Sequence, residues 1–569
     1  TGPVEALVME FLDARRLTGP SLLFDGPAAI LDVGIAHTDV ADFRTRWEAA
    51  VLRMAAEFDW PDPEFNHLVL TGGASFAFTA PVDALYAASM INEWAYAEVA
   101  ARMGQGDVPD YAAGLEAARV AYADEVNPPL LELEVLAKEH NTTFLWDDDE
   151  VSLGLGKYSE TWPVDAVPDP GSIDWPRFRD VPLGIVTGTN GKTTTVRLAQ
   201  HILIDAGRTV GLSSTDWIAV NHDVIDRGDW SGPGGARTVL RQPGVDVAVL
   251  EAARGGLLRR GLGVQKADAA LITNISEDHL GDFGSHTVDE LLDVKWVISR
   301  AVRDSGRLIL NADDPRLCAK AADYPGAIVW FSIERQTLDG LPGNSAALFC
   351  LAGHDMALEA NGATTSIVDV RDVPLTMQGI ARHNVANALA AAALTWCLGA
   401  ELAEIGAGLK SMSQDDNPGR CNLYDLGGRK VLIDFAHNPA AMQALFAMAE
   451  AIPAERRVLC FGQAGDRPDD LIEELTRDAY AMGLDRVIVS ELAKYHRGRE
   501  MGEVFGVIRT ELERLGMARD AVEHNDEEMD TLQSALEWAR PGDLVIMLAL
   551  GGSAPIAERL TQLGAKSLS

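Results

Sequence analysis

The sequence contains little cysteine. There are 5 cysteines in 569 residues, none in the first half of the chain and no two in a CxxC pair. They are Cys318, Cys350, Cys397, Cys421 and Cys460. Disulfide frameworks and structural zinc sites both require closely grouped ligands, so we expect neither here.

Long apolar runs are also missing. The longest, residues 385–400, is shorter than the ~20 residues that span a bilayer, and it contains Asn387. The first residues, TGPVEALVMEF, lack the basic segment and following apolar segment of a secretory signal. We therefore expect a cytoplasmic protein.

Positive charge is scarce. Lysine and arginine number 48 against 85 aspartates and glutamates, which gives a net charge of −37. Such a chain is repelled by nucleic acid and by anionic membranes, so we expect it to bind neither. Any polyanionic ligand must meet a local cluster of positive groups.

The chain is long enough for several domains. Its 569 residues correspond to about two to four domains of ordinary size. Proline-rich sequence at residues 161–182 disfavours both helix and central strand, and we assign residues 164–180 as a linker. The predicted domains are residues 1–163, 181–416 and 417–569.

After this linker, short apolar runs alternate with helix-compatible segments. The runs are LGIVTG, DVAVLE, DAALITN, GRLILN and AIVWF. This alternation is typical of a parallel sheet with helices on both faces. From residue 417 the pattern repeats in KVLIDFAHN, RRVLCFG, DRVIVSE and DLVIMLA, which predicts a smaller, Rossmann-like domain. The fold class is therefore α/β.

The N-terminal region has a different pattern. We expect helices at Tyr86 to Met103 and at Tyr111 to Asp124, and strands at Ala28 to Val33 and at Asn66 to Leu70. Mixed elements of this kind predict an α+β domain. Its histidines are not grouped in sequence, so we expect no metal site there. The roles we expect for it are assembly or holding one substrate.

The stretch TGTNGKTTT, residues 187–195, indicates a phosphate site of the P-loop type. An apolar strand precedes it, and a segment with helical spacing begins at Lys192. Backbone N–H groups at such a turn attract phosphate oxygens, Lys192 can neutralise the β and γ phosphates, and the Thr193 hydroxyl can bind Mg²⁺. The alternative is an ordinary glycine turn before a helix. Val186 occupies the position of the usual first glycine, which indicates a subclass of loop.

GTNGKTT resembles the nucleotide loop of the Mur ligases. These are the ATP-dependent amide ligases of peptidoglycan synthesis and their relatives, which include folylpolyglutamate synthases and cyanophycin synthetases. Further matches follow in the family's order: a strand ending in Glu251, SEDHLG from Ser276, Lys295 in a helix, LNADDP from Leu310, RHNVANALAA from Arg382, NPGR ending at Arg420, and IDFAHNP from Ile433. The resemblance covers about residues 180–569.

Three short segments, LEAARGGLLRRGL, GDRPDD and HRGREMGE, are most similar to the Mur-ligase-like part of cyanophycin synthetases. Two earlier segments, RRLTGPSLLF and VSLGLGKYSETWP, resemble the N-domain of those enzymes and the start of their ATP-grasp module. Only about thirty residues separate that region from the phosphate loop, too few for a domain of ~50 residues or more. The resemblance therefore implies one ligase site rather than two.

The resemblance implies ATP and Mg²⁺ as cofactors. The residues implied to hold the phosphates are Gly188, Thr189, Asn190, Gly191, Lys192, Thr193 and Thr194. Thr193 and Glu251 would bind one Mg²⁺, and His279 would bind a second. Lys295 matches a lysine that is carbamylated in several Mur ligases, and a plain salt-bridging lysine is an equal alternative. Lys192, Glu251, His279, Lys295 and Arg420 form the implied catalytic set.

The nucleoside and the substrates are expected between domains. Asn384 matches the asparagine that meets adenine, and Arg420 and Asp434 match residues that reach the γ-phosphate and the ribose. Closure of the domains would then complete the site and exclude water. The expected substrate contacts are Thr215, Asp216, Arg254, His437, Asn438, Asp466 and Arg467. For Asp466 and Arg467, solvated loop charges are an equal alternative.

The implied reaction joins a carboxylate to an amine through an acyl phosphate, with release of ADP and phosphate. We expect the carboxylate on a small molecule or short peptide, and an amino acid as the amine. A homo-oligomer is expected, although the sequence does not give the subunit number. The alternatives are a folylpolyglutamate synthase and a nucleotide-gated binding or assembly protein whose catalytic centre is idle.

Overall fold

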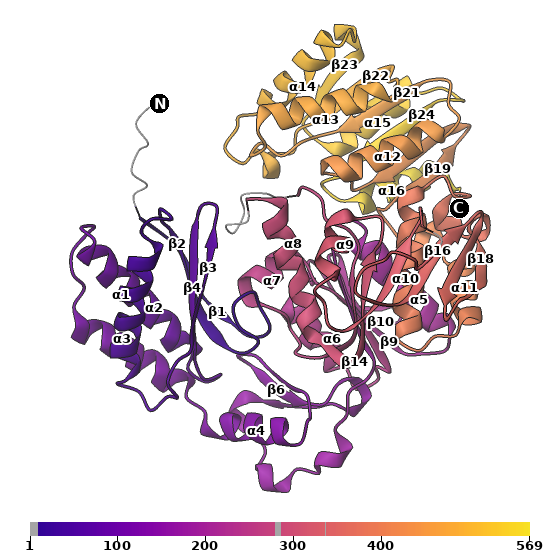
Figure 1. Ribbon diagram of the computed structural model, residues 1–569. Helices are drawn as coiled ribbons and strands as arrows, with labels where there is room; N and C mark the ends of the chain where they lie inside the picture. Colours follow the sequence, from indigo (N-terminus) through magenta and orange to yellow (C-terminus); the bar gives the residue numbers. More distant parts are fainter. Residues whose placement is uncertain (1–8, 279–285, 336, 569) are drawn as a thin grey trace.

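The computed structural model describes residues 9–278, 286–335 and 337–568. Across these ranges the strands form sheets of 4, 3, 11 and 7 members, in chain order (Figure 1). The 11-stranded sheet lies between the N-terminal and the C-terminal sheets in the chain, and the C-terminal part sits above it in Figure 1.

The N-terminal sheet is antiparallel, with strand order β1-β2-β4-β3. Its strands are β1 (Glu10–Leu17), β2 (Ala28–Gly34), β3 (Phe65–Leu70) and β4 (Gly73–Thr79). The helices of this part are α1 (Val40–Ala55), α2 (Leu85–Arg102), α3 (Tyr111–Glu125) and α4 (Pro128–Glu139). Fully buried Phe43, Trp47, Phe76 and Phe78 pack between the sheet and its helices. This arrangement confirms the α+β prediction.

The linker segment is irregular but packed. A small sheet of β5 (Phe144–Trp146), β6 (Glu150–Leu153) and β7 (Glu160–Pro163) precedes it. Only short 3-10 turns follow before residue 183, as the prolines predict. Phe178 and Val181 are buried, and Asp180 accepts a hydrogen bond from Arg303 at 2.6 Å. The segment therefore packs against its neighbours, and its role as a linker stays a prediction.

The central sheet has strand order β11-β10-β9-β12-β8-β13-β14-β15-β16-β17-β18. Its strands are β8 (Leu183–Thr187), β9 (Val210–Ser213), β10 (Trp217–Val220), β11 (Asp223–Arg227), β12 (Val247–Glu251), β13 (Ala267–Ile272), β14 (Val302–Asn311), β15 (Ala327–Ser332), β16 (Asn344–Ala352), β17 (Asp355–Ala360) and β18 (Ala363–Asp369). Pairing is parallel from β9 to β16, and both edges are antiparallel. Strands covered on both faces must be apolar throughout, which is why the runs were recognisable in sequence.

Helices cover both faces of this sheet. One face carries α5 (Lys192–Asp205), α10 (Arg382–Cys397) and α11 (Leu402–Ser411). The other carries α6 (Pro233–Leu240), α7 (Arg254–Arg260), α8 (Val288–Trp296) and α9 (Pro315–Ala321). The predicted parallel sheet with two helical layers is confirmed.

The C-terminal sheet has strand order β23-β22-β21-β24-β20-β19-β25, parallel from β23 to β20. Its strands are β19 (Asn422–Leu426), β20 (Arg429–Asp434), β21 (Arg457–Phe461), β22 (Arg486–Ser490), β23 (Val522–Asn525), β24 (Leu544–Leu548) and β25 (Lys566–Ser567). One face is covered by α12 (Pro439–Ala451), α13 (Asp469–Ala481) and α14 (Glu503–Arg514), and the other by α15 (Glu528–Trp538) and α16 (Ser553–Gln562). This is the second doubly wound sheet that the sequence predicts.

Within the described ranges, no helix combines the length and the apolar character needed to cross a membrane.

Candidate active site

The candidate site lies where three parallel strands of the central sheet end. Glu251 at the end of β12 stands opposite Val186 of β8, and Ile272 of β13 stands opposite Thr187. The carboxyl ends of parallel strands are where open α/β sheets bind ligands. The loop from β8 to α5 therefore emerges between an acidic strand end and the segment that follows β13.

Two glycines make the loop a close-fitting cradle. Gly188 has φ +143° and Gly191 has φ +86°, both in the range that favours glycine. A Cβ at Gly188 would lie 1.9 Å from Thr273 Oγ1, and one at Gly191 would lie 2.2 Å from Asn387 Oδ1. Neither position has room for a side chain, so the backbone itself forms the surface that faces a ligand.

Replacing Gly191 with alanine tests this cradle. Because the new methyl would collide with Asn387, we expect Gly191→Ala to weaken nucleotide binding by about tenfold or more, measured by calorimetric titration. Gly207→Ala is the matched control, since Gly207 has φ +79° but, within the part of the chain that the structure describes, no atom lies within 4 Å of a Cβ at this position. It should lose only about 1 kcal/mol of stability and bind normally. Equal binding by both variants would count against the cradle.

Long-range hydrogen bonds hold the loop in place. Thr189 N donates to Asn274 O at 2.9 Å, and Asn190 N donates to Asn274 Oδ1 at 3.0 Å. The ammonium group of Lys192 donates to Thr189 O at 2.9 Å, so the side chain folds back over the loop. Lys192 is half-buried. Its charge thus lies against the backbone of the turn, where a phosphate would need it.

Next to the loop, hydroxyl and carboxylate oxygens cluster around Glu251, which is only 2% exposed. Thr193 Oγ1 donates to Glu251 Oε2 at 3.1 Å, and Thr215 Oγ1 donates to Glu251 Oε1 at 2.7 Å. Mg²⁺ prefers oxygen ligands and uses few protein carboxylates when phosphates supply the rest. Thr193 and Glu251 therefore fit the predicted metal role. His279, the other predicted ligand, lies outside the described residues.

A lysine is buried beneath the loop. Lys295 is 3% exposed, and its ammonium group donates to Gly188 O at 2.8 Å. Burial is the main reason that the pKa of Lys295 falls well below its usual value, and the charge of Lys192 lowers it further. Asp278 and Glu251 partly oppose this shift. The arrangement favours an uncharged amine at the base of the site.

The C-terminal part contacts the loop directly. The side-chain amides of Asn190 and Asn438 form a reciprocal pair, with N···O distances of 2.9 and 3.2 Å. Asn438 also caps α12 by accepting from Ala441 N at 3.0 Å. Asn417 donates to Thr194 Oγ1 at 3.3 Å. Asn190 in the loop and Thr194 in the first turn of α5 are thus held by side chains of the chain beyond residue 416.

Arg197 is a buried residue of α5 that the sequence reasoning missed. Its guanidinium group donates to Asp216 Oδ2 at 2.5 Å, to Asn417 Oδ1 at 3.1 Å and to Pro418 O at 3.2 Å. It also lies 4.0 Å from the centre of the Trp217 ring. Burial lowers the pKa of Arg197 to about 10, with Asp216 opposing the shift. The sequence does show an arginine in the second turn of a helix that must pack on a buried sheet. That position was the one sign that Arg197 could be buried.

Removing Arg197 should weaken the contact between α5 and the segment at Asn417 and Pro418. Arg197→Met keeps the apolar stem but removes the donor to Asn417 and Pro418 and the nearer of the two arginines at Asp216. We expect the thermal unfolding midpoint to fall by about 5 °C or more, measured by calorimetry. Arg227→Met removes an exposed arginine whose guanidinium lies 5.8 Å from the same Trp217 ring, and it should have little effect. An unchanged midpoint for Arg197→Met would contradict this role.

Two predicted nucleotide contacts from the C-terminal part, Arg420 and Asp434, lie near the contact between Arg197 and Asn417. Arg420 approaches Asp216 at 3.5 Å and lies 4.8 Å from the centre of the Phe435 ring. Asp434 accepts from Cys421 N at 2.8 Å and from Ala436 N at 2.7 Å, so its carboxylate orders the adjacent turn.

Asn384 is the predicted adenine contact, and it is buried in α10. Its side-chain amide donates to Leu375 O at 2.9 Å, and its oxygen accepts from Asn387 at 3.2 Å. Asn387 is the residue whose Oδ1 faces Gly191, so Asn384 is linked to the phosphate loop through one side chain.

The remaining predicted substrate residues divide into two groups. Arg467 donates to His437 O and, at 2.7 Å, to Gln463 Oε1, and burial lowers the pKa of Arg467. It therefore lies beside the Asn438 turn. The exposed carboxylate of Asp466 instead accepts from Arg497 at 2.8 Å.

Two predicted residues approach the segment that follows β13. His437 Nε2 lies 3.8 Å from Asp278 Oδ1. Arg254 begins α7, three residues after Glu251, and its charge contributes to the lowered pKa of Lys295. Both therefore lie near the loop and the acidic strand end.

Comparisons with known proteins agree with this architecture. The Mur ligase middle domain matches residues 186–395, and the Mur ligase glutamate ligase domain matches residues 419–551. The chain is 34% identical over 379 residues to the cyanophycin synthetase of Crocosphaera subtropica, a match that covers 64% of this chain and 42% of that protein. It is 30% identical over 404 residues to the UDP-N-acetylmuramyl-tripeptide synthetase of Deinococcus radiodurans, covering 66% and 74%.

Among solved structures, a crystal structure of MurF from Acinetobacter baumannii matches with a TM-score of 0.49 at 20% identity, covering 67% of this chain and 77% of that one. The fold and the loop define a P-loop-type α/β protein with a second doubly wound domain. The chain belongs to the Mur ligase family. It spans about two fifths of the length of the cyanophycin synthetases that it matches.

Proposed function

We propose that this chain is an ATP-dependent carboxylate–amine ligase that works through an acyl phosphate. One observation supports this most strongly: Lys192 and the glycine cradle lie directly beside the Thr193–Glu251 oxygen pair. Catalysis on a nucleoside triphosphate needs positive charge, backbone donors and a carboxylate that can bind Mg²⁺ in one place. Lys192, the loop and Glu251 would fill these three roles.

The loop residues would bind the phosphates of ATP. Backbone groups from Gly188 to Gly191 would surround them, with Lys192 and the hydroxyl of Thr194 adding charge and polarity. Asn384 would meet the adenine. Arg420 and Asp434 would reach the γ-phosphate and the ribose from beyond the central sheet.

Thr193 and Glu251 would hold Mg²⁺, and His279 remains the proposed ligand of a second ion. Mg²⁺ neutralises the charge that develops on the transferred phosphoryl group. The buried position of Glu251 keeps water from competing for its oxygens.

Two bond exchanges make up the reaction. A carboxylate oxygen of the substrate forms a bond to the γ-phosphorus, and the bond from that phosphorus to ADP breaks. The amine nitrogen then bonds to the acyl carbon, phosphate leaves, and the amine loses a proton to solvent or a nearby base. The Asn190–Asn438 pair would keep the two parts together over the intermediate and so exclude water.

Substrate contacts are proposed for the groups that surround the loop. Arg254 can pair with a carboxylate through its planar fork. The other proposed contacts are Thr215, Asp216, His437, Asn438, Asp466 and Arg467. We propose an amino acid as the amine and a small molecule or short peptide as the carboxylate, joined by one kind of bond. Assembly as a homo-oligomer stays a prediction.

Lys295 gives a prediction of its own. Burial and Lys192 lower the pKa of Lys295, which favours the uncharged, nucleophilic form of its amine, and we expect this amine to form a carbamate with CO₂. In ¹³C-bicarbonate, NMR should show one carbamate carbonyl signal that Lys295→Arg abolishes and that Lys410→Arg, a change at an exposed lysine, retains. Without such a signal, Lys295 is a plain hydrogen-bonding lysine.

The function is tested by a pairwise screen. Amino acids and short acidic peptides are supplied in pairs with ATP, and phosphate release is measured while mass spectrometry reads the products. We expect release that requires both a carboxylate and an amine, with a product lighter by one water than their sum. Release that needs neither, or ATP binding without any turnover, would reject the ligase proposal.

A further inference from the structure

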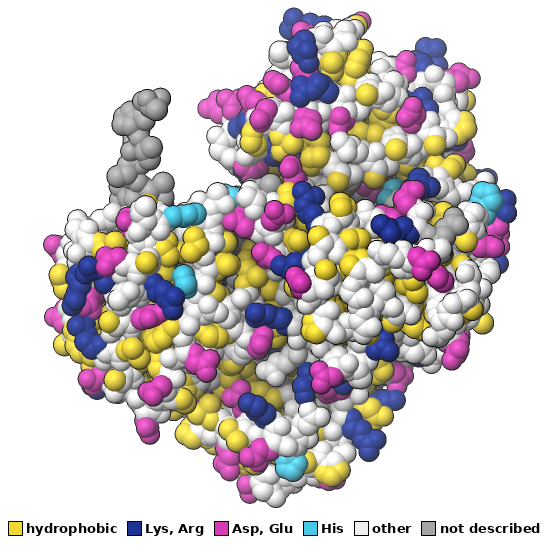
Figure 2. Space-filling model, in the orientation of Figure 1, with side chains coloured by type: hydrophobic (Ala, Val, Ile, Leu, Met, Phe, Trp, Pro, Cys, Tyr) yellow, Lys and Arg dark blue, Asp and Glu magenta, His cyan; other side chains and the backbone are white. Residues whose placement is uncertain are grey.

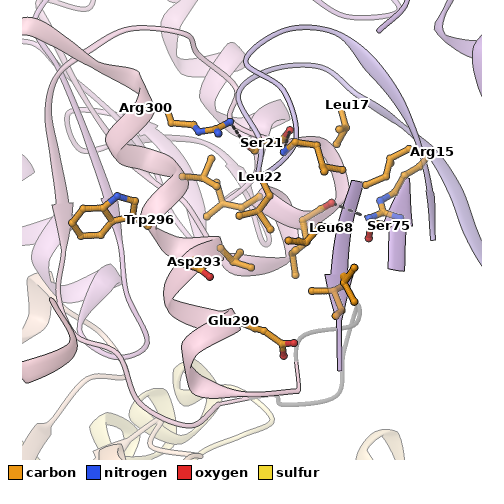
Figure 3. A pocket seen from close by; sticks show the side chains of 18 residues that line it. Arg15, Leu17, Ser21, Leu22, Leu68, Ser75, Glu290, Asp293, Trp296 and Arg300 are labelled. Atoms are coloured by element: carbon orange, nitrogen blue, oxygen red, sulfur yellow. Dashed lines mark hydrogen bonds between the residues drawn. The ribbon is translucent and has the colours of Figure 1, made fainter. Parts of the chain in front are cut away.

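The turn between β3 and β4 of the N-terminal sheet touches α8 of the central part. Thr71, the first residue of this turn, donates twice to Glu290 Oε1, from its backbone N at 3.0 Å and from its hydroxyl at 2.9 Å. Figure 3 shows Glu290 near the start of α8, with its side chain directed toward the N-terminal sheet. In the space-filling view, hydrophobic side chains gather in the hollow between the two parts (Figure 2). Thr71 therefore adds a polar contact to a mainly apolar junction.

Glu290 also caps α8 itself. Its Oε2 accepts from His286 N at 2.7 Å and from Thr287 N at 2.9 Å, and Glu290 N donates to Thr287 Oγ1 at 3.2 Å. One carboxylate oxygen thus serves the helix and the other serves the turn. Burial raises the pKa of Glu290, but the four donors together outweigh burial and lower it. The carboxylate is therefore held in its charged form, in which its hydrogen bonds are strongest.

The turn has little freedom to follow the helix if the helix moves. It contains only two residues, because Leu70 pairs with Gly73. A Cβ at Gly73 would lie 2.1 Å from Val33 O, so the turn packs closely against β2. His37 Nε2 lies 2.9 Å from Leu70 O, within hydrogen-bond distance. The N-terminal sheet thus presents Thr71 from a fixed position.

A second contact holds the chain just beyond the other end of α8. Arg300, in the 3-10 turn Val297–Ala301 that follows the helix, donates to Ser21 O at 2.6 Å (Figure 3). Ser21 belongs to the segment that joins β1 to β2. The N-terminal part therefore contacts this stretch of chain both at its start and at its end.

Between these two contacts lies Lys295. Its ammonium group donates to Gly188 O at 2.8 Å, and the residue is 3% exposed. Lys295 follows Glu290 by one and a half turns of a helix that has only 9 residues, so a displacement at Glu290 is passed on to Lys295. A shift of about 1 Å would take the hydrogen bond to Gly188 out of its normal range.

We infer that Thr71 is a positioning residue for the ligase site: through Glu290 it fixes α8 and so keeps Lys295 in its buried contact with the phosphate loop. The importance of Lys295 rests on the proposed function, but its position can be tested without turnover. The N-terminal sheet thereby has a role in the site of its own chain, in addition to assembly or the holding of a substrate.

Two substitutions of equal size at Thr71 test the inference. Asp-Gly and Asn-Gly both favour two-residue hairpin turns, so Thr71→Asp and Thr71→Asn keep the turn. The new aspartate repels Glu290, whereas the asparagine amide can donate to it. Each protein is methylated with formaldehyde and cyanoborohydride in bicarbonate-free buffer, and the modified lysines are quantified by peptide mass spectrometry. Thr71→Asp should speed methylation of Lys295 at least about fivefold, and Thr71→Asn should not.

Two references show whether the effect is specific. Lys410 is exposed and should react at the same rate in every protein. Thr45→Asp adds the same charge to an exposed position of α1 and should leave Lys295 protected. Protection of Lys295 in a folded Thr71→Asp protein, or equal loss of protection in Thr71→Asn, would overturn the inference.

A second pair of variants applies if Thr71→Asp fails to fold. Thr71→Val removes only the hydroxyl donor and should also speed methylation of Lys295, while Thr71→Ser retains the donor and should keep Lys295 protected. Equal rates for these two would overturn the inference. Because methylation needs no turnover, a chain without ligase activity would count against the proposed function and would still show whether Thr71 holds Lys295 in place.

Discussion

Replacing Lys192 with alanine should reduce ATP turnover by at least about a hundredfold while the fold persists. Lys192 places the ammonium group over the loop through its 2.9 Å hydrogen bond to Thr189 O, whereas Lys295, which also donates to the loop, is only 3% exposed. In this acidic chain, with a net charge of −37, the loss of that local charge leaves a polyphosphate facing a negative field.

The measurement is ATP hydrolysis or ligation under saturating nucleotide, with circular dichroism and thermal unfolding to check the fold. Lys410→Ala serves as the control because Lys410 is an exposed lysine that pairs with Asp372. It should be fully active. A Lys192→Ala protein with normal turnover would place the phosphates elsewhere.

Glu251→Gln should also reduce turnover by about a hundredfold or more, and it should raise the Mg²⁺ concentration needed for half-maximal activity. The substitution keeps the size of the side chain and removes its charge. The amide oxygen can still accept the hydrogen bond from Thr193, and the amide NH₂ group can donate to the hydroxyl of Thr215, so the loss would report on the metal rather than on the fold.

A Mg²⁺ titration of activity distinguishes these effects. Glu334→Gln is the control, since Glu334 is an exposed glutamate paired with Arg382. It should leave the titration unchanged. If Glu251→Gln lowered turnover without altering the Mg²⁺ dependence, Glu251 would not be a metal ligand.

Much of the fold could be predicted because buried parallel strands must be apolar along their whole length. The strand expected at Ala28 to Val33 is β2, Ala28–Gly34, and the run DVAVLE forms β12. Edge strands were harder to recognise. β11 is exposed at every residue, so it has no buried face to produce an apolar pattern. β14 begins at Val302, earlier than the run GRLILN, because a register shift extends its pairing with β13.

The candidate site was only partly predictable, for a different reason. A local motif reveals the residues of one turn, such as Gly191, Lys192 and Thr193. The groups that hold this turn come from far along the chain, as Asn387 and Asn438 do. The sequence alone, without the family resemblance, gives no spacing rule that joins them.

Arg197 shows the same limit. Its position inside a helix is visible in the sequence, but its partner Asp216 becomes a neighbour only when the central sheet forms, and Asn417 only when the chain beyond residue 416 returns to α5.

The central claim is that the γ-phosphoryl group of ATP activates a carboxylate in this site. The most direct measurement supplies the protein with Mg-ATP, ¹⁸O-labelled carboxylates and hydroxylamine in place of the amine. The account predicts ATP-dependent hydroxamate and one ¹⁸O atom in the released phosphate. Release of ADP and phosphate with neither hydroxamate nor label would contradict it.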